Sequence, residues 1–256
     1  MSERADAAGE DSRDGPLLDL QGVCAEVEGF QVTFDVDLQV DAGEAVALVG
    51  RNGAGKTSTF RGIMGLTPLA RGTVRFKDEN ITAIRPELIP KRGIGYQPED
   101  RDLFTGMTVE ENFRLPIWTS GDARGIDDED EMVESIFELF DELQDRRDVE
   151  VQNLSGGQAK MCAIGRAMAL DPELLILDEP LEGLAPIVVE NLKTYIHEII
   201  DRDISVLMAE SNASHVPDIA DRMYVIERGS ILASGDPETL VQDPEIQELM
   251  QGGAEG

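Results

Sequence analysis

One segment constrains the fold of this chain more than any other, an eight-residue match to the pattern GxxxxGK[ST] at positions 50–57. An apolar run at 44–49 precedes it and a helical pattern at 56–66 follows, which is the strand–loop–helix context that a phosphate-binding loop requires. Glycines let the backbone wrap closely around a phosphate, and the helix N-terminus presents positive dipoles to the anion. The residues expected to contact phosphates are Gly50, Arg51, Asn52, Gly53, Ala54, Gly55, Lys56, Thr57 and Ser58.

A second motif supplies carboxylates to the same chemistry. An apolar run at 174–177 ends in Asp178 and Glu179, and in a parallel sheet this places both acids at the carboxyl edge, beside the phosphate loop. Lys56 would reach the β and γ phosphates of a nucleotide, and the Thr57 hydroxyl would hold Mg²⁺. Asp178 would bind the same ion through water, and Glu179 would polarise the attacking water. Together the two motifs predict Mg-ATP binding and hydrolysis.

Strand and helix patterns alternate along the chain, which predicts an α/β fold with a mostly parallel sheet covered on both faces. Residues 1–15 are polar, acidic and without periodicity, so we expect a disordered N-terminus. One domain is predicted over 16–245, followed by a flexible C-terminus at 246–256. The segment from about 98 to 160 is helix-rich and lacks strand signals, and it is the candidate subdomain.

The charge of the chain excludes some classes of binding partner. Its 52 acidic residues against 22 basic ones give a net charge of −30, and such a surface repels nucleic acid and anionic lipid. No run approaches the roughly 20 apolar residues that span a bilayer, so a soluble protein that meets the membrane through partners is predicted. The acidic excess is dispersed and lysine is scarce, which is typical of proteins from cells with molar cytosolic salt, where screening removes self-repulsion.

A third motif, at 154–158, comes before a helical pattern. Its residues are Leu154, Ser155, Gly156, Gly157 and Gln158. With this stretch the chain resembles the ABC ATPase family, whose LSGGQ signature it reproduces letter for letter. The resemblance covers roughly residues 17–240 and implies a RecA-like P-loop NTPase core with a mixed sheet and a helical subdomain. It also implies a homo- or heterodimer of ATPase subunits, in which the signature of one subunit closes on the ATP held by the other.

Further segments look like the ATPases of branched-chain amino-acid importers, namely 94–104, 107–112, 178–186 and 210–212. That resemblance implies two integral-membrane permease subunits as partners, a position on the cytoplasmic face of the membrane, and an extracellular substrate-binding protein reached indirectly. The loop at 99–112 would pass movement to the permease. Urea and amide importers are a near alternative. A soluble ABC ATPase not coupled to transport, such as a cluster-assembly ATPase, and a module that binds nucleotide without hydrolysis are more distant ones.

The chain departs from the family pattern at three positions. The family's metal-contacting glutamine aligns with Glu99, and the amino-acid importers also have Glu at this position. Gln97 lies two residues earlier and would face the same side of a strand, so it is the alternative metal contact. The family's switch histidine aligns with Ser211, while His215 follows four residues later. Ser211 is therefore a candidate for tuning the rate, with Glu179 as the base. Phe30 is a candidate adenine platform, with a core phenylalanine as the alternative.

Overall fold

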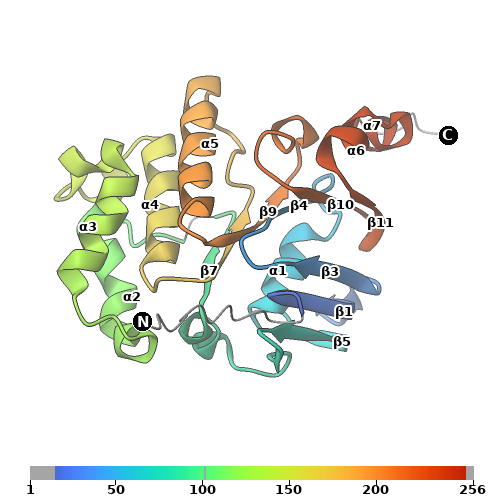
Figure 1. The fold of residues 1–256 in the computed structure, drawn as a ribbon, viewed down its shortest axis with the longest axis horizontal. Coiled ribbons are helices and arrows are strands. Elements are labelled where there is room, and N and C mark those ends of the chain that lie inside the picture. Colours follow the sequence, from blue (N-terminus) through green and yellow to red (C-terminus); the bar gives the residue numbers. More distant parts are fainter. Residues whose placement is uncertain (1–14, 101, 252–256) are drawn as a thin grey trace, which may run out of the picture.

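The computed structural model describes residues 15–100 and 102–251, and two sheets organise them (Figure 1). The expectation of a disordered N-terminus concerns residues 1–15, of which 1–14 lie outside the described residues. The larger sheet has the order β11-β10-β4-β9-β8-β7. Its strands are β7 (Ile94–Gln97), β8 (Leu174–Asp178), β9 (Ser205–Glu210), β4 (Ala45–Val49), β10 (Arg222–Glu227) and β11 (Ser230–Gly235). All neighbours pair in parallel except β11, which is antiparallel to β10.

The second sheet is antiparallel and lies on the lower right in Figure 1. It is formed by β1 (Leu18–Val27), β2 (Phe30–Gln31), β3 (Val36–Val40), β5 (Leu69–Phe76) and β6 (Glu79–Asn80). The sequence predicts one strand over 30–40, but the structure divides it into β2 and β3. The reason is local, because Asp35 takes a left-handed φ of 51° that interrupts extended backbone.

Seven α-helices and five short 3₁₀ helices complete the described chain. The α-helices are α1 (Lys56–Ile63), α2 (Val109–Arg124), α3 (Glu129–Leu139), α4 (Gly156–Met168), α5 (Pro186–Ile200), α6 (Pro237–Gln242) and α7 (Pro244–Gln251). The 3₁₀ helices are η1 (Pro86–Leu88), η2 (Pro90–Arg92), η3 (Asp141–Arg146), η4 (Val151–Asn153) and η5 (Ala213–His215). Helices α2 and α3 lie within 98–160, and α4 begins there and continues to Met168, packing against β7 and β8.

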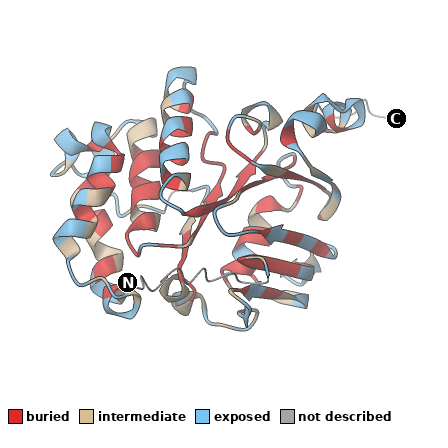
Figure 2. Ribbon diagram, viewed as in Figure 1, coloured by how far each residue is buried: buried red, intermediate tan, exposed pale blue. Residues whose placement is uncertain are grey.

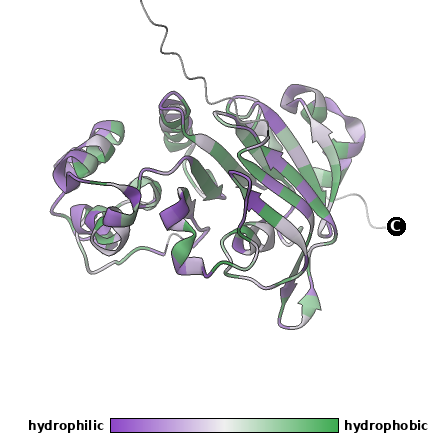
Figure 3. Cartoon of the chain, turned by 60° about the horizontal axis from the view of Figure 1, so that its bottom comes forward, coloured by the Kyte–Doolittle hydropathy of each residue, from purple (hydrophilic) through white to green (hydrophobic). Residues whose placement is uncertain are grey.

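The core divides into two clusters because successive side chains of the central strands point to opposite faces. On β4, Val46 and Leu48 join the cluster that contains α1 and the antiparallel sheet. Ala47 and Val49 join the other cluster, which contains residues of α2, α3, α4 and α5. Figure 2 shows the central strands as a buried band between these layers. Figure 3 shows hydrophilic and hydrophobic residues alternating along the peripheral helices, as one-sided burial requires.

The C-terminal segment differs from its expected flexibility as far as residue 251. Helix α7 occupies 244–251, whereas the sequence predicts a flexible tail from 246. Ile246 is buried, and Leu249 and Met250 pack against the larger core cluster. The spacing of these three residues places them on one helix face, and this amphipathic pattern gives the segment a place to dock. None of the helices within 15–100 and 102–251 combines the length and apolar character needed to cross a bilayer.

Candidate nucleotide site

The site forms where four parallel strands end at the same edge of the larger sheet. Val49 lies opposite Glu210, and Asp178 lies opposite Ala209 on the neighbouring strand. Gln97 ends β7 beside Leu177. Since parallel strands share their carboxyl edge, the phosphate loop, the Asp178–Glu179 pair and Ser211 come together there. This edge is where the sequence places the chemistry.

The phosphate loop wraps back on itself before α1 begins. Gly55 has a φ of 112°, a left-handed conformation that suits glycine and disfavours other residues. The loop borders a cavity of about 460 Å³, which is also lined by Val27, Val32, Glu99 and Glu179. A cavity next to a helix N-terminus is suited to a phosphate-bearing ligand.

Lys56 is 4 % exposed and lies at the centre of the polar contacts. Its ammonium donates to the carbonyl of Gly50 at 2.6 Å and to the Ser211 hydroxyl at 2.9 Å. It also forms an ion pair with Glu179 at 2.9 Å, in which both side chains are 4 % exposed. A buried ion pair is stable only when its remaining donors and acceptors are satisfied, and these contacts satisfy them.

Glu179 is held on both carboxylate oxygens. The Ser211 amide donates to Oε2 at 3.0 Å, and the Ser211 hydroxyl lies 2.6 Å from Oε1. That hydroxyl also lies 2.7 Å from Oδ1 of Asn52, so its single proton serves one of these two acceptors at a time. The structure thus brings Ser211, Lys56 and Glu179 into one cluster.

His215 occupies a different place from Ser211. It ends η5 and lines a second cavity of about 440 Å³, together with Glu179, Glu210 and Ser211. A helix over 212–220 would place His215 one turn from Ser211, but the helical part is the single turn Ala213–His215. His215 therefore lines the same cavity as Glu179, but the hydrogen bonds to the Glu179 carboxylate come from Ser211.

Asp178 and Thr57 form the other half of the site. The Thr57 hydroxyl donates to Oδ1 of Asp178 at 3.2 Å, and the Tyr96 hydroxyl lies 3.3 Å from Oδ2. Burial raises the pKa of Asp178 to about 6, and the carboxylates of Glu99 and Glu179 add to the rise. Two hard oxygen ligands that meet in a site crowded with carboxylates fit a divalent cation such as Mg²⁺.

Gln97 and Glu99 compete for a place beside that pair. Gln97 is fully buried, and its amide donates to the carbonyls of Pro98 and, at 3.5 Å, Asp178. Its oxygen Oε1 is buried without a hydrogen-bond partner among the described residues. Glu99 is exposed and lines the cavity of the phosphate loop. An orphaned acceptor next to Asp178 is a natural ligand for a cation or its water, so both residues fit the metal.

The signature residues lie apart from that cavity, at the start of α4. Ser155 caps the helix, accepting from the Gln158 amide at 3.2 Å, and the Gln158 side chain accepts from the Ser155 amide. A Cβ on Gly157 would come within 2.6 Å of Val188, so glycine is needed for α4 to approach α5. Ser155 and Gly156 are exposed at the N-terminus of this helix. Leu154 precedes it, packed against the larger core cluster.

Phe30 is not a core residue, since it is 75 % exposed. It follows the two-residue turn of Glu28 and Gly29, both with positive φ, and pairs with Val27 across the hairpin. Side chains of a cross-strand pair lie on the same face, so Phe30 shares a face with Val27, which lines the cavity of the phosphate loop. The alternative of a core phenylalanine is therefore wrong.

Sequence reasoning missed three residues that the structure places at this edge. Lys160 of α4 and Glu210 of β9 are 3 % and 1 % exposed, and Tyr96 contacts Asp178. Burial raises the pKa of Glu210 to about 8, with the charge of Glu179 adding to it. The available signals are weak: a lysine among the apolar residues of a helix, and a glutamate directly after an apolar strand run.

Comparisons with known proteins point to one family. Residues 33–182 match the family described as ABC transporter. The chain is 34 % identical over 237 residues to the high-affinity branched-chain amino acid transport ATP-binding protein BraG of Pseudomonas aeruginosa, covering 93 % of this chain and 100 % of the relative. It is 32 % identical over 235 residues to the lipopolysaccharide export system ATP-binding protein LptB of Escherichia coli, covering 92 % and 97 %.

Solved structures show the same architecture. An ATP-binding cassette of an ABC transporter in its ADP conformation superposes with a TM-score of 0.80 at 27 % identity, covering 93 % of this chain and 99 % of that one. A nucleotide-free ATP-binding cassette superposes equally well, with a TM-score of 0.80 at 26 % identity and coverage of 93 % and 100 %. The fold predicted from the sequence is confirmed by these likenesses.

Proposed function

The chain belongs to the ABC transporter family and hydrolyses ATP, and we propose that it drives an importer of branched-chain amino acids across the cell membrane. The observation that carries its catalytic part is the cluster of Lys56, Glu179 and Ser211 at the edge of the sheet, beside Thr57 and Asp178. The cargo is supported by the similarity to BraG along nearly the whole of both chains.

In this proposal each residue of the site has one task. Lys56 exchanges its contacts with Glu179 and Ser211 for phosphate oxygens when ATP binds, which releases the Glu179 carboxylate toward the attacking water. Glu179 accepts the proton of that water, and Ser211 holds the carboxylate in place. Phe30 stacks on the adenine from the hairpin. Because Ser211 replaces the family's switch histidine, the rate of hydrolysis is changed but hydrolysis is retained.

Thr57 and Asp178 would hold Mg²⁺, with Gln97 or Glu99 as the further ligand. When bound, it would neutralise charge on the β and γ phosphates. The chain's own contribution is a prearranged pair of oxygens and the buried Oε1 of Gln97. Glu99 lines the cavity of the phosphate loop, and its carboxylate would be the alternative ligand.

The signature implies that two ATPase subunits, either identical or related, close on two ATP molecules. Ser155 and Gly156 are exposed at the N-terminus of α4, where a partner subunit's γ-phosphate can reach their amides. The residues of this second anion cradle are Leu154, Ser155, Gly156, Gly157 and Gln158.

An apolar groove supports the membrane partner. It has a volume of about 680 Å³ and lies between the end of α1, β7 and the helices α2 and α4. Its walls include Leu66, Phe104, Leu115 and Pro116, and the first two are 44 % and 49 % exposed. On a chain with a net charge of −30, an exposed apolar groove marks a protein contact. We assign it to an apolar helix on the cytoplasmic side of a permease subunit.

Two further proposals follow the same reasoning. The dispersed acidic surface suits a cytosol with molar salt, where screening shortens the range of repulsion to about 3 Å.

A second cargo is favoured by a specific likeness: LptB, an ATP-binding protein of lipopolysaccharide export, is nearly as similar to this chain as BraG is. Urea or amide import, and a soluble role without transport, have less support.

Purification of the tagged chain from native membranes in high KCl, with mass spectrometry of what accompanies it, tests the proposal. Two polytopic membrane proteins, a second ATPase and an amino-acid binding protein are the expected companions. If the chain is recovered with components of an export system, the proposed amino-acid cargo is wrong. If it is recovered with soluble assembly factors alone, the transport role is wrong, while the assignment as an ATPase stands.

A further inference from the structure

Two buried ionisable side chains, Lys160 and Glu210, lie next to the catalytic cluster without belonging to any of the motifs that define it. Lys160 is on α4, five positions after the signature Ser155, and is 3 % exposed. Glu210 ends β9 directly before Ser211 and is 1 % exposed. Burying a charge costs free energy unless a partner compensates it, so both positions require a reason.

Both side chains bind the backbone of the turn that carries Glu179. The Lys160 ammonium donates to the carbonyl of Glu179 at 2.7 Å in a buried contact. The Glu210 carboxylate accepts from the amide of Leu181 at 3.1 Å, also buried. The turn that begins at Glu179 is thus tied to α4 by one contact and to the end of β9 by the other.

This turn needs external support. Glu179 has a φ of 50°, a left-handed conformation that non-glycine residues adopt only where surrounding structure holds them. Its amide donates to the carbonyl of Ala209 at 3.1 Å, which fixes one end of the peptide. Lys160 fixes the carbonyl end, and the direction of the side chain depends on both.

We propose that Lys160 and Glu210 are positioning residues for ATP hydrolysis, which hold the backbone of Glu179 and Leu181 so that movement of the signature helix reaches the Glu179 carboxylate. The proposal rests on the base role proposed for Glu179. Lys160 is on the helix whose first turn carries the signature, and Glu210 adjoins Ser211, which binds both oxygens of Glu179. A misplacement of about 1 Å at a reacting group can cost about 100-fold in rate, so these contacts matter for turnover.

The charges around Glu210 make this arrangement adjustable. Burial and the charge of Glu179 raise the pKa of Glu210, while the hydrogen bond from the Leu181 amide and the charges of Lys160 and Lys56 lower it. Protonated or ionised, Glu210 keeps an oxygen that can accept from Leu181. Loss of the Lys160 charge can therefore be absorbed by a proton on Glu210, so a variant without this charge is expected to fold.

The first test compares Lys160→Met with Lys160→Arg. We expect Lys160→Met to lower kcat about tenfold or more, because the Glu179 carbonyl loses its donor. The KM for Mg-ATP and the affinity for a fluorescent ATP analogue should change less than about twofold, since the phosphate loop is intact. Lys160→Arg retains a donor and should recover most of the rate.

A matched control is Lys193→Met on α5. Lys193 is also buried, at 8 % exposure, and its ammonium pairs with Asp218 at 2.7 Å and Glu190 at 3.1 Å. Both of these partners lie outside the turn that Lys160 and Glu210 hold, so the same substitution should leave kcat unchanged. A purely structural effect of losing a buried lysine would lower both variants alike.

The second test approaches the turn from the other side. Glu210→Leu removes the acceptor of the Leu181 amide and should lower kcat with unchanged nucleotide affinity, whereas Glu210→Gln keeps an acceptor and should retain most activity. If Lys160→Met or Glu210→Leu does not fold, the other variant still decides the proposal. Equal kcat in Lys160→Met and wild type, or a fall in nucleotide affinity that accounts for the whole loss, overturns it.

Glu179→Gln separates this inference from the one beneath it. If Glu179→Gln abolishes turnover while Lys160→Met and Glu210→Leu remain fully active, only the positioning role fails. If Glu179→Gln itself turns over ATP, the proposed base is wrong and the positioning role fails with it.

Discussion

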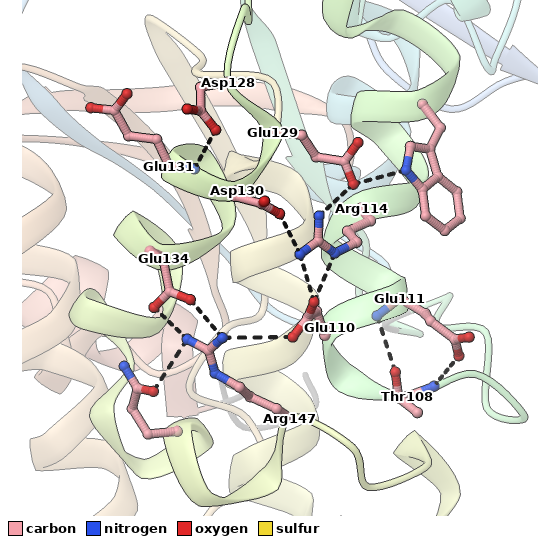
Figure 4. A network of polar contacts seen from close by, with 12 residues as sticks. Thr108, Glu110, Glu111, Arg114, Asp128, Glu129, Asp130, Glu131, Glu134 and Arg147 are labelled. Atoms are coloured by element: carbon pink, nitrogen blue, oxygen red, sulfur yellow. Dashed lines mark hydrogen bonds and ion pairs between the residues drawn. The ribbon is translucent and has the colours of Figure 1, made fainter.

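Two clusters of charge in this molecule use the same side-chain chemistry in opposite surroundings. The cluster at the sheet edge buries Lys56 and Glu179, each with a 4 % exposed side chain, at 2.9 Å from one another. The network on the helical region joins Arg114 and Arg147 to acidic residues of α2 and α3 (Figure 4). Its members are exposed to differing degrees, from 21 % for Arg114 to 80 % for Asp130.

The difference lies in what solvent does to each cluster. In the partly exposed network, Arg114 forms ion pairs at 2.6 Å to Glu110, 2.6 Å to Glu129 and 2.8 Å to Asp130, and Arg147 pairs with Glu134 and Glu110. Such pairs contribute little net stability because water and salt screen them. The buried cluster is shielded from salt, so its charges can orient a reacting group. Burial, more than residue type, therefore decides which of the two charged clusters can take part in catalysis.

The largest expected effect comes from Glu179→Gln. Removing the base should lower ATP turnover by at least about 100-fold, the usual contribution of a positioned general base. The amide keeps the size of the side chain and its contact with Ser211, so nucleotide binding should persist. Phosphate release measures turnover and filter binding measures ATP. Turnover near that of wild type would remove Glu179 from the chemistry.

Lys56→Met should act on binding. Loss of a charge-assisted contact to phosphate predicts roughly a 10- to 100-fold weaker ATP affinity. Isothermal titration measures this directly. The matched comparison is Lys193→Met, which removes a buried lysine away from the site and should leave affinity unchanged. Equal affinities in the two variants would show that Lys56 does not reach the phosphates.

Most of this site follows from sequence because its motifs are contiguous. The phosphate loop, Asp178 with Glu179, and the signature each need only a strand or helix end to place them, and the structure provides those ends. Lys160 and Glu210 could not be found this way. Their contacts with the catalytic turn span 19 and 29 residues and depend on how α4 and β9 pack around it.

The fold shows the same division between local and packed features. Alternating strands and helices predict the parallel sheet, but the break at Asp35 depends on one residue with positive φ. The docking of α7 depends on a core surface that only the folded chain presents. Gln97 and Glu99 show the same division, since Gln97 is buried beside Asp178 and Glu99 lines the cavity of the phosphate loop.

The buried cluster should also give the protein a pH dependence. Burial raises the pKa of Glu210 in the folded protein from its ordinary value of 4.5 to about 8. Between pH 4.5 and about pH 8, the folded protein therefore keeps a proton on Glu210 that the unfolded chain has lost. This stabilisation is complete below the ordinary value and is lost as pH rises toward about 8. Glu210→Gln should remove that decline, which the two pKa values limit to about 5 kcal/mol of unfolding free energy. Parallel curves for variant and wild type, by calorimetry from acidic to alkaline pH, would contradict it.

The smallest expected effect belongs to the exposed network. Arg114→Gln should lower the free energy of unfolding by less than about 1 kcal/mol in low salt. The matched control is Arg85→Gln, whose pair with Glu87 joins side chains that are 74 % and 59 % exposed and should contribute almost nothing. Denaturant unfolding measures both. A loss of several kcal/mol for Arg114→Gln would place this network among the structural contacts of the fold.

A KCl titration of Lys160→Met and Arg114→Gln, each relative to wild type, tests the contrast between the two clusters most directly. From about 0.2 M to about 2 M salt, the kcat ratio of Lys160→Met should stay low and constant, because its contact is buried. Over the same range the stability difference of Arg114→Gln should shrink toward zero. If salt restores the kcat of Lys160→Met, or leaves the deficit of Arg114→Gln unchanged, the division between buried and screened charge is wrong.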